Sequence, residues 1–218
     1  MSNFTTWRSL VDGEEILAIP DSVVEDFERT NPLDDYFGDV GDFDVVDSDP
    51  IEGDKTLETD RGAGQEIIST SGLSDYPQRG DVFSCLIMAT DSRGGPEVIF
   101  GASDVDNFYD VRTEPGSDNI RLAVTEGGSR TTLDSASPSL DVGEVYDVGI
   151  TWSENNDIDV SLYDWDETEF ERGSALASLS ANDDTHASES GIGFRTAGND
   201  GQDPNRWDWY VIRDKGGA

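Results

Sequence analysis

Basic residues are scarce in this sequence. Its 218 residues include only 14 Lys and Arg against 48 Asp and Glu, which gives a formal net charge of −34. Lysine occurs only at Lys55 and Lys215, so the other cations are arginines. Because no basic stripe is present to offset phosphates, we expect no binding to DNA or RNA. The same charge argues against binding to anionic membrane surfaces.

Long apolar runs, cysteine and histidine are scarce too. The longest apolar run, residues 82–89, is far shorter than the roughly 20 residues of a membrane helix, so we expect no membrane insertion. Residues 1–15 lack a basic start before an apolar stretch, which predicts no secretory signal. Cys85 is the only cysteine, which excludes an internal disulfide and indicates a packing role. With His186 as the only histidine, a zinc site or a catalytic triad is disfavoured.

The excess of acid indicates a salty environment. Self-repulsion at this net charge destabilises a compact chain, and molar salt screens it by shortening the Debye length to about 3 Å. We therefore expect an extreme halophile, or a virus of one, as the source. The apolar residues fall in short β-rich runs instead of being scattered, which argues against disorder.

Short strand-like runs follow one another from residue 22 onward, each bounded by Gly, Pro, Asp or Ser. No long stretch has helical periodicity. This pattern predicts an all-β, two-sheet antiparallel sandwich over residues 22–214. Residues 1–21 are expected to form an N-terminal arm or docking segment, and residues 215–218 a C-terminal tail. The expected strands are 22–28, 41–47, 55–60, 64–70, 81–90, 96–103, 107–114, 119–126, 130–135, 143–153, 156–166, 175–181, 190–197 and 206–214.

The arm has an apolar pattern of its own. Trp7, Leu10 and Val11 are spaced as on a short helix of about two turns, which Gly13 would end. Together with Ile16, these apolar residues are the predicted docking residues of the arm.

Two strands carry the clearest side-chain patterns. In residues 156–166, apolar residues alternate with polar ones, so we expect Asp157 and Asp159 to face solvent. The large core anchors are expected to include two tryptophans that share one strand face, Trp207 and Trp209. The full set of expected anchors is Trp152, Phe194, Trp207, Trp209 and Tyr210.

The strand sequences resemble a concanavalin A-like, laminin-G-like jelly roll. The resemblance rests on "VVEDFE" (23–28), on "VYDVGITW" (145–152) followed by "IDVSLYD" (158–164), on "LASLSA" (176–181) and "GIGFR" (191–195), and on "WDWYVIRD" (207–214) as a closing strand. The acidic composition and the N-terminal "WRSLVDGEE" (7–15) are similar to domains carried by proteins of haloarchaeal tailed viruses. This resemblance implies a virion protein.

Calcium is the one candidate cofactor. Jelly rolls of this kind often hold calcium where the first and last strands meet, and hard cations prefer clustered oxygen ligands. The candidate ligands are Glu28, Asp34 and Asp208.

Glycan binding and catalysis give the other candidate residues. Tyr163 and Trp165 fall on the polar face of their strand and form a candidate sugar-binding pair, although we prefer the alternative that Trp165 caps the strand end and covers the core. The alternating carboxylate strand of concanavalin-like glucanases is missing. Its nearest approach is Glu167, Glu169 and Glu171, which lie in an expected loop. We therefore expect no enzyme activity.

Three functions follow in order of preference. The first is a non-enzymatic virion structural or adhesion protein of a haloarchaeal virus, as a capsid-surface, fibre or tail-associated subunit. It would contact other virion proteins and form a homo-oligomer. The second is a lectin-like, carbohydrate-binding module for host-surface glycans. The third is a glycoside hydrolase or lyase. The expected location is the virion, or otherwise the cytoplasm or cell surface of a halophile.

Overall fold

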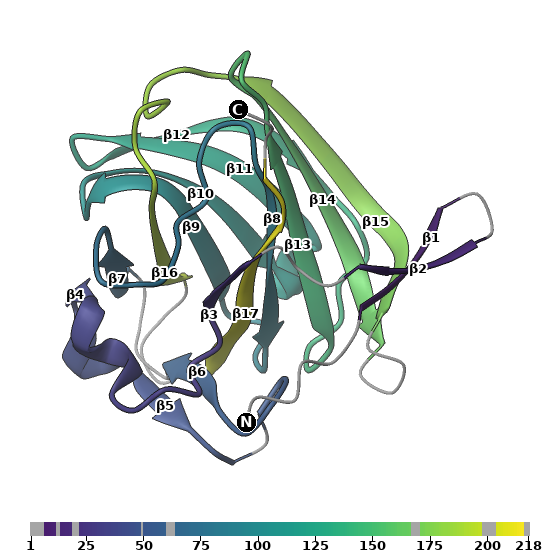
Figure 1. Cartoon of the computed structure of the whole chain (residues 1–218), viewed down its shortest axis with the longest axis horizontal. Coiled ribbons are helices and arrows are strands. Elements are labelled where there is room, and N and C mark those ends of the chain that lie inside the picture. The colour runs from purple at the N-terminus through teal and green to yellow at the C-terminus, as the bar shows by residue number, and fades with distance from the viewer. Residues whose placement is uncertain are drawn as a thin grey trace.

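Two antiparallel β-sheets packed face to face form the body of the molecule (Figure 1). The computed structural model describes residues 7–11, 14–18, 22–48, 50–59, 64–166, 171–197 and 204–215, the first two ranges as backbone alone. These residues form strands and short 3-10 helices, which confirms the predicted jelly-roll sandwich. No helix within the described ranges is long and apolar enough to cross a membrane.

The first sheet has eight strands in the order β15-β14-β13-β8-β17-β6-β5, and β3 pairs with β17 beside this path. Its first and last strands in sequence therefore lie together, as the resemblance implied. The strands are β3 (Ser22–Glu25), β5 (Asp44–Val46), β6 (Thr56–Thr59), β8 (Val82–Ala89), β13 (Val145–Trp152), β14 (Asp157–Asp166), β15 (Glu171–Asn182) and β17 (Asn205–Asp214).

The second sheet has seven strands in the order β12-β11-β10-β9-β16-β7-β4. Its strands are β4 (Phe37–Gly38), β7 (Glu66–Ser69), β9 (Gly95–Asp104), β10 (Asn107–Glu114), β11 (Asn119–Glu126), β12 (Ser129–Ala136) and β16 (Gly191–Ala197). The short 3-10 helices are η1 (Pro32–Asp35), η2 (Val40–Asp42) and η3 (Pro115–Ser117).

The arm forms a β-hairpin, so the predicted helix is wrong. Strands β1 (Trp7–Val11) and β2 (Glu14–Ala18) pair antiparallel as a sheet of their own. The sequence between them is Asp12-Gly13, a dipeptide that favours two-residue hairpin turns. This turn signal outweighs the helical spacing, which rests on three apolar residues. The hairpin projects from the sandwich body, and its strand β1 lies beside β15 (Figure 1).

The core lies between the sheets and is rich in aromatic rings. Trp152 is fully buried, with its ring centroid 5.6 Å from that of Phe100 and 5.8 Å from that of Tyr109. On β14, Ile158, Val160 and Leu162 are buried, whereas Asp157 and Asp159 are exposed, as the alternation predicts.

One expected anchor is displaced by a β-bulge. The pairing of β17 with β8 shifts register between Asp208 and Val211, and Trp209 has a φ of 46°. The extra residue changes the phase of the strand, so Trp207 and Tyr210 both enter the core. Trp209 is only half-buried and does not share the core face of Trp207.

Candidate functional site

The outer surface of the seven-stranded sheet gathers charged side chains. Val98 and Val111 point into the core, so their neighbours Glu97, Asp110 and Arg112 point outward, because strand side chains alternate between faces. The same alternation applies along the other strands of this sheet. We call the resulting set the arginine face: Glu66, Glu97, Asp110, Arg112, Glu114, Arg121, Arg130 and Arg195.

Strand register aligns five members of the arginine face in one row. Arg121 on β11 lies opposite Arg112 on β10, which lies opposite Glu97 on β9. Glu97 in turn lies opposite Arg195 on β16, and Arg195 opposite Glu66 on β7. Four strand spacings of about 4.8 Å give this row a length of about 19 Å. Guanidinium and carboxylate groups are thus presented side by side across five strands.

Two buried carboxylates anchor the centre of the face. Arg130 donates from Nη1 to Glu97 Oε1 at 3.1 Å and from Nη2 to Asp110 Oδ1. Glu97 is 1% exposed and Asp110 is fully buried. Arg112 Nε lies 3.6 Å from Glu97 Oε1, so a second arginine shares the same carboxylate.

Burial changes the pKa values of the acids. It raises the pKa of Asp110 to about 8, and the negative charge of Glu97 adds to the effect despite the opposing charge of Arg130. Burial likewise raises the pKa of Glu66 to about 7, against the charge of Arg195. Asp110 is therefore harder to ionise than a solvent-exposed aspartate.

The arginine face has unused hydrogen-bonding capacity. Its guanidinium-bearing side chains are between 19% and 27% exposed, so a ligand can reach them. Four arginines oppose four carboxylic residues, two of which have raised pKa values, so the face carries at most a small net positive charge at neutral pH. Several buried side-chain atoms within it lack a hydrogen-bond partner. They are Glu97 Oε2, Asp110 Oδ2 and the Nε atoms of Arg112, Arg121, Arg130 and Arg195.

The predicted aromatic pair does not form a sugar-binding platform. Trp165 is 6% exposed, packs with Leu86 and Met88, and donates from Nε1 to Glu52 Oε1 at 3.2 Å. The pairing of β13 with β14 is regular, so Tyr163 and Trp165 both lie on the outer face of the eight-stranded sheet, as the alternation predicts. Trp165 therefore covers the outer side of the eight-stranded sheet, and Tyr163 alone is partly exposed.

Tyr163 belongs to a compact ion-pair cluster on the eight-stranded sheet. The Arg172 guanidinium lies 4.5 Å from the centre of the Tyr163 ring. Arg172 Nε and Arg213 Nη2 both donate to Asp147 Oδ2 at 2.6 Å. Burial acts to raise the pKa of Asp147, but the two arginines outweigh it and lower the pKa. This cluster ties β13, β15 and β17 together.

Two of the three predicted calcium ligands accept hydrogen bonds from backbone N–H groups. Glu28 Oε1 accepts the backbone N–H groups of Asp54 at 2.6 Å and Lys55 at 2.8 Å. Asp208 is buried and accepts the N–H of Glu52 at 2.9 Å, while Asp34 lies exposed on η1. Across the described ranges, no three His, Cys, Asp or Glu side chains are placed to hold a metal ion. The structure thus does not bring these three carboxylates together.

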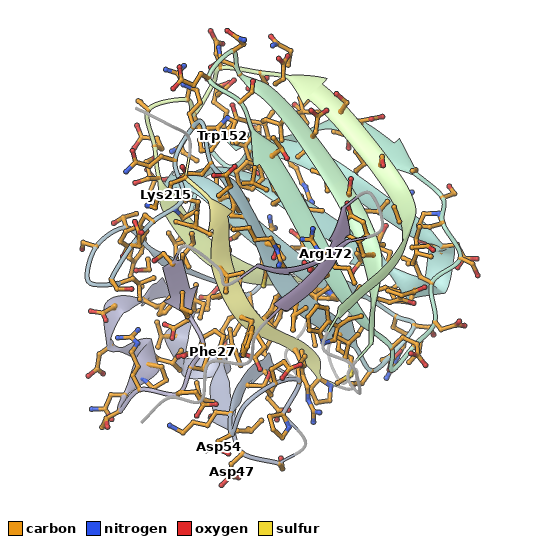
Figure 2. All side chains as sticks on the ribbon, turned by 45° about the vertical axis from the view of Figure 1, so that its right-hand side comes forward. Phe27, Asp47, Asp54, Trp152, Arg172 and Lys215 are labelled. Atoms are coloured by element: carbon orange, nitrogen blue, oxygen red, sulfur yellow. The ribbon has the colours of Figure 1, made fainter. Side chains whose placement is uncertain are left out.

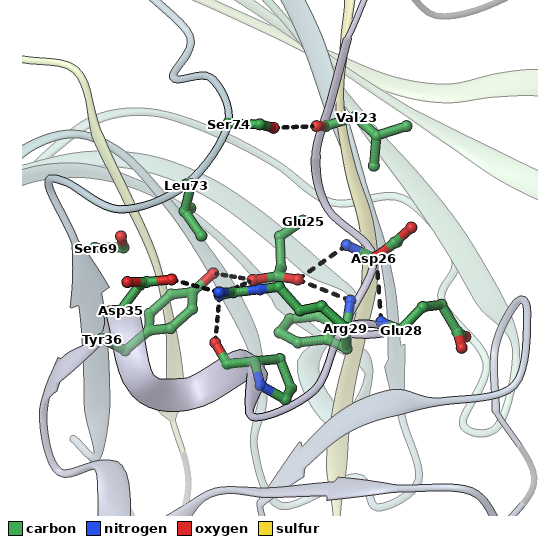
Figure 3. Close-up of polar contacts among 12 residues, drawn as sticks. Val23, Glu25, Asp26, Glu28, Arg29, Asp35, Tyr36, Ser69, Leu73 and Ser74 are labelled. Atoms are coloured by element: carbon green, nitrogen blue, oxygen red, sulfur yellow. Dashed lines mark hydrogen bonds and ion pairs between the residues drawn. The ribbon is translucent and has the colours of Figure 1, made fainter. Parts of the chain in front are cut away.

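A buried glutamate organises the loop after β3 (Figure 3). Glu25 Oε1 accepts the N–H of Phe27 at 2.9 Å, and Oε2 accepts from Arg29 Nη2 at 2.8 Å and from the Tyr36 hydroxyl at 3.3 Å. Burial raises the pKa of Glu25. Arg29 also donates to Asp35. Both carboxylate oxygens of Glu25 are occupied, so this network holds the loop and offers no ligand site.

Some predicted site residues lie outside the part of the chain that the structure describes. The side chains of Trp7, Leu10, Val11 and Ile16 are not described, and residues 167–170 fall in a gap between the described ranges. The arginine face was missed, although a signal was present. A chain with so few cations places Arg112, Arg121 and Arg130 within three consecutive strands.

No family model matches the sequence, and no curated protein matches it. Solved structures do share its fold. A carbohydrate-binding module, CBM66, from Bacillus subtilis is 14% identical over 83% of this chain and 96% of that one, with a TM-score of 0.55. The calreticulin globular domain of T. cruzi is 10% identical over 88% and 89%, with a TM-score of 0.54.

A legume lectin-like domain from Entamoeba histolytica is 12% identical over 82% of this chain and 92% of its own, with a TM-score of 0.51. At such identities the similarity is one of fold alone. It agrees with the concanavalin A-like jelly roll that the strand sequences predict.

Proposed function

We propose that the protein is a lectin-like module that binds a neutral, polyhydroxylated saccharide along the arginine face. The observation that carries the proposal is the row from Arg121 to Glu66, in which three arginines and two glutamates stand side by side over about 19 Å on one sheet surface. A sugar hydroxyl both donates and accepts hydrogen bonds, so a chain of sugars matches such a row.

Local charge favours a neutral ligand. The small positive charge of the face attracts anions only weakly, and the net charge of −34 on the whole molecule repels them. Among the described residues, the exposed large hydrophobic side chains are Phe37 and Val142 alone. The described surface therefore offers little for an apolar protein partner.

The buried acids favour binding over hydrolysis. Glu97 and Asp110 lie under the arginines and both bond to Arg130. A glycosidase needs two carboxyl groups that reach the scissile bond from either side. In our proposal these two acids hold and orient the guanidinium groups.

Two arginine substitutions test the proposal. Wild-type protein would first be screened on an array of neutral and acidic saccharides in molar KCl, and the best ligand titrated by calorimetry. Arg112→Ala and Arg195→Ala should each weaken binding at least tenfold, since each removes a charged hydrogen-bond donor. Arg93→Ala removes the same charge from an exposed loop outside the face and should bind normally. Equal affinity in all four proteins would refute the site.

The virion role stays a prediction from the sequence. A surface subunit of a halophilic virus that recognises host glycans would combine the first two expected functions, so the proposal is compatible with that location. The same holds for a location at the surface of a halophile.

A further inference from the structure

Two arginines converge on one carboxylate at the outer surface of the eight-stranded sheet. Val148 on β13 points into the core, so its neighbours Asp147 and Gly149 point outward. Arg172 reaches Asp147 from β15, and Arg213 reaches it from β17 on the other side of β13. The two donor nitrogens each lie 2.6 Å from Asp147 Oδ2, so they are at most twice that distance apart. Two positive groups are therefore held close together.

One carboxylate does not balance two guanidinium groups. Among the described residues, Asp147 is the carboxylate within ion-pair distance of Arg172 and Arg213. Burial lowers the pKa of Arg213 to about 10, and the positive charge of Arg172 adds to this effect against the attraction of Asp147. The cluster thus keeps a net positive charge that is only partly compensated, in a chain whose net charge is −34.

The arginines of this cluster can bind more than Asp147. Arg172 donates from Nε to Asp147, and its Nη2 lacks a hydrogen-bond partner. The side chains of Arg172 and Arg213 are 27% and 16% exposed, so a solute can reach them. Guanidinium groups form their strongest hydrogen bonds with anions.

Small residues lie beneath the guanidinium group of Arg172. Strand register aligns four of them in one row across the sheet: Ser84 on β8, Gly149 on β13, Ser161 on β14 and Ser178 on β15. A Cβ on Gly149 would lie 2.8 Å from Arg172 Nη2, so this arginine lies directly over the glycine. Gly149 sits within regular strand pairing, so its lack of a side chain serves the position of Arg172.

We infer that Arg172 and Arg213 together bind a chloride ion on the outer surface of the eight-stranded sheet. A chloride ion accepts several N–H groups at once and balances the second guanidinium charge. The net charge of −34 repels every anion, but molar KCl supplies chloride and also screens that repulsion. An ion that binds only the folded chain stabilises it, so this site links folding to chloride itself, in addition to the screening that any salt provides.

Diffraction from crystals soaked in molar KBr tests the inference, because bromide replaces chloride and its anomalous scattering locates it. Wild type should show a bromide ion within hydrogen-bond distance of Arg172 and Arg213. Gly149→Ala displaces the guanidinium group of Arg172 without changing any charge, and it should lose this ion. Bromide found in wild type only elsewhere on the surface, as an adventitious ion only, would overturn the inference. A bromide ion that persists unchanged in Gly149→Ala would overturn it too.

Unfolding equilibria at increasing KCl concentration give a second measurement. A site with a dissociation constant of about 0.1 M would lower the unfolding equilibrium constant about tenfold in 1 M chloride, beyond the effect of screening. Arg172→Met should lose this part of the salt dependence. Arg93→Met removes the same charge from an exposed turn and should retain it. Equal salt dependence in the three proteins would contradict the chloride site.

The two proposals can fail separately. The arginine face lies on the other sheet, so Arg172→Met and Gly149→Ala should bind saccharides as wild type does. Loss of bromide with unchanged saccharide binding in Gly149→Ala would support the chloride site alone.

Discussion

Gly101 occupies a position that tolerates no side chain. Its φ is +56°, and a Cβ there would lie 2.9 Å from Trp152 Cη2 and 3.2 Å from Tyr109 Cδ2. The left-handed backbone alone costs a non-glycine residue about 1–2 kcal/mol. The contact with two core rings adds an overpacking cost of about 1–3 kcal/mol.

Gly101→Ala should therefore lower the thermal unfolding midpoint more than a matched glycine substitution does. Gly127 has a φ of +55°, and a Cβ there would meet nothing within 4 Å, so Gly127→Ala isolates the backbone cost. In a chain of this size each kcal/mol corresponds to about 2–4 °C. Equal midpoints for the two variants in molar KCl would show that the core yields to the added methyl group.

Asp110 should make stability depend on pH. Its pKa is about 8 in the folded chain against the ordinary 3.8, so the folded state binds its proton more tightly than the unfolded state does. The resulting stabilisation is complete below about pH 4 and is lost as the pH rises to about 8. Glu66, with a pKa of about 7, acts in the same direction.

Asp110→Asn removes the titrating carboxyl group but keeps the shape of the side chain. The unfolding midpoint of wild type, followed from pH 5 to pH 9 in molar KCl, should fall with rising pH, and that of the variant should fall less. Parallel curves for the two proteins would mean that Asp110 does not hold a proton in the fold.

The sequence predicted the placement of single side chains well where the alternation along one strand decides it. It predicted placement poorly where a side chain depends on a partner from a distant strand. Asp157 and Asp159 were placed correctly because alternation along one strand was sufficient. Trp165 was placed on the correct face, but its burial depends on contacts with Leu86 and Met88 of β8, which the sequence of β14 does not reveal. The row from Arg121 to Glu66 pairs Arg195 with Glu97, 98 residues away, and with Glu66, 129 residues away, which no local pattern reveals.

At the scale of elements, most strands were predictable and irregular pairing was not. Runs of apolar residues between turn residues located the strands of the sandwich closely. The arm was misjudged as a helix because three apolar residues fit either period, and Asp12-Gly13 decides for a hairpin. The bulge at Trp209 has no signature in "WDWYVIRD", because its cause is the pairing of β17 with β8.

At the scale of the whole molecule, charge is the dominant feature. Acidic side chains such as Asp47 and Asp54 project from the rim of the sandwich (Figure 2). Repulsion among 48 acids opposes compaction, and its range shrinks from about 10 Å at 0.1 M salt to about 3 Å at 1 M.

Folding should therefore require salt. The far-ultraviolet circular dichroism of the β-sandwich should be lost on dialysis to low ionic strength and recovered in molar KCl, because screening removes the repulsion. A spectrum that stays unchanged at low salt would contradict the halophilic origin expected from the composition.

Binding of saccharides to the arginine face is tested most directly on a saccharide array. Wild-type protein and Arg112→Ala would be applied side by side to an array of neutral and acidic saccharides in molar KCl, after both spectra are shown to match. Wild type should bind neutral saccharides on the array, and Arg112→Ala should not. An array on which wild type binds nothing, or on which the variant binds as wild type does, would contradict it.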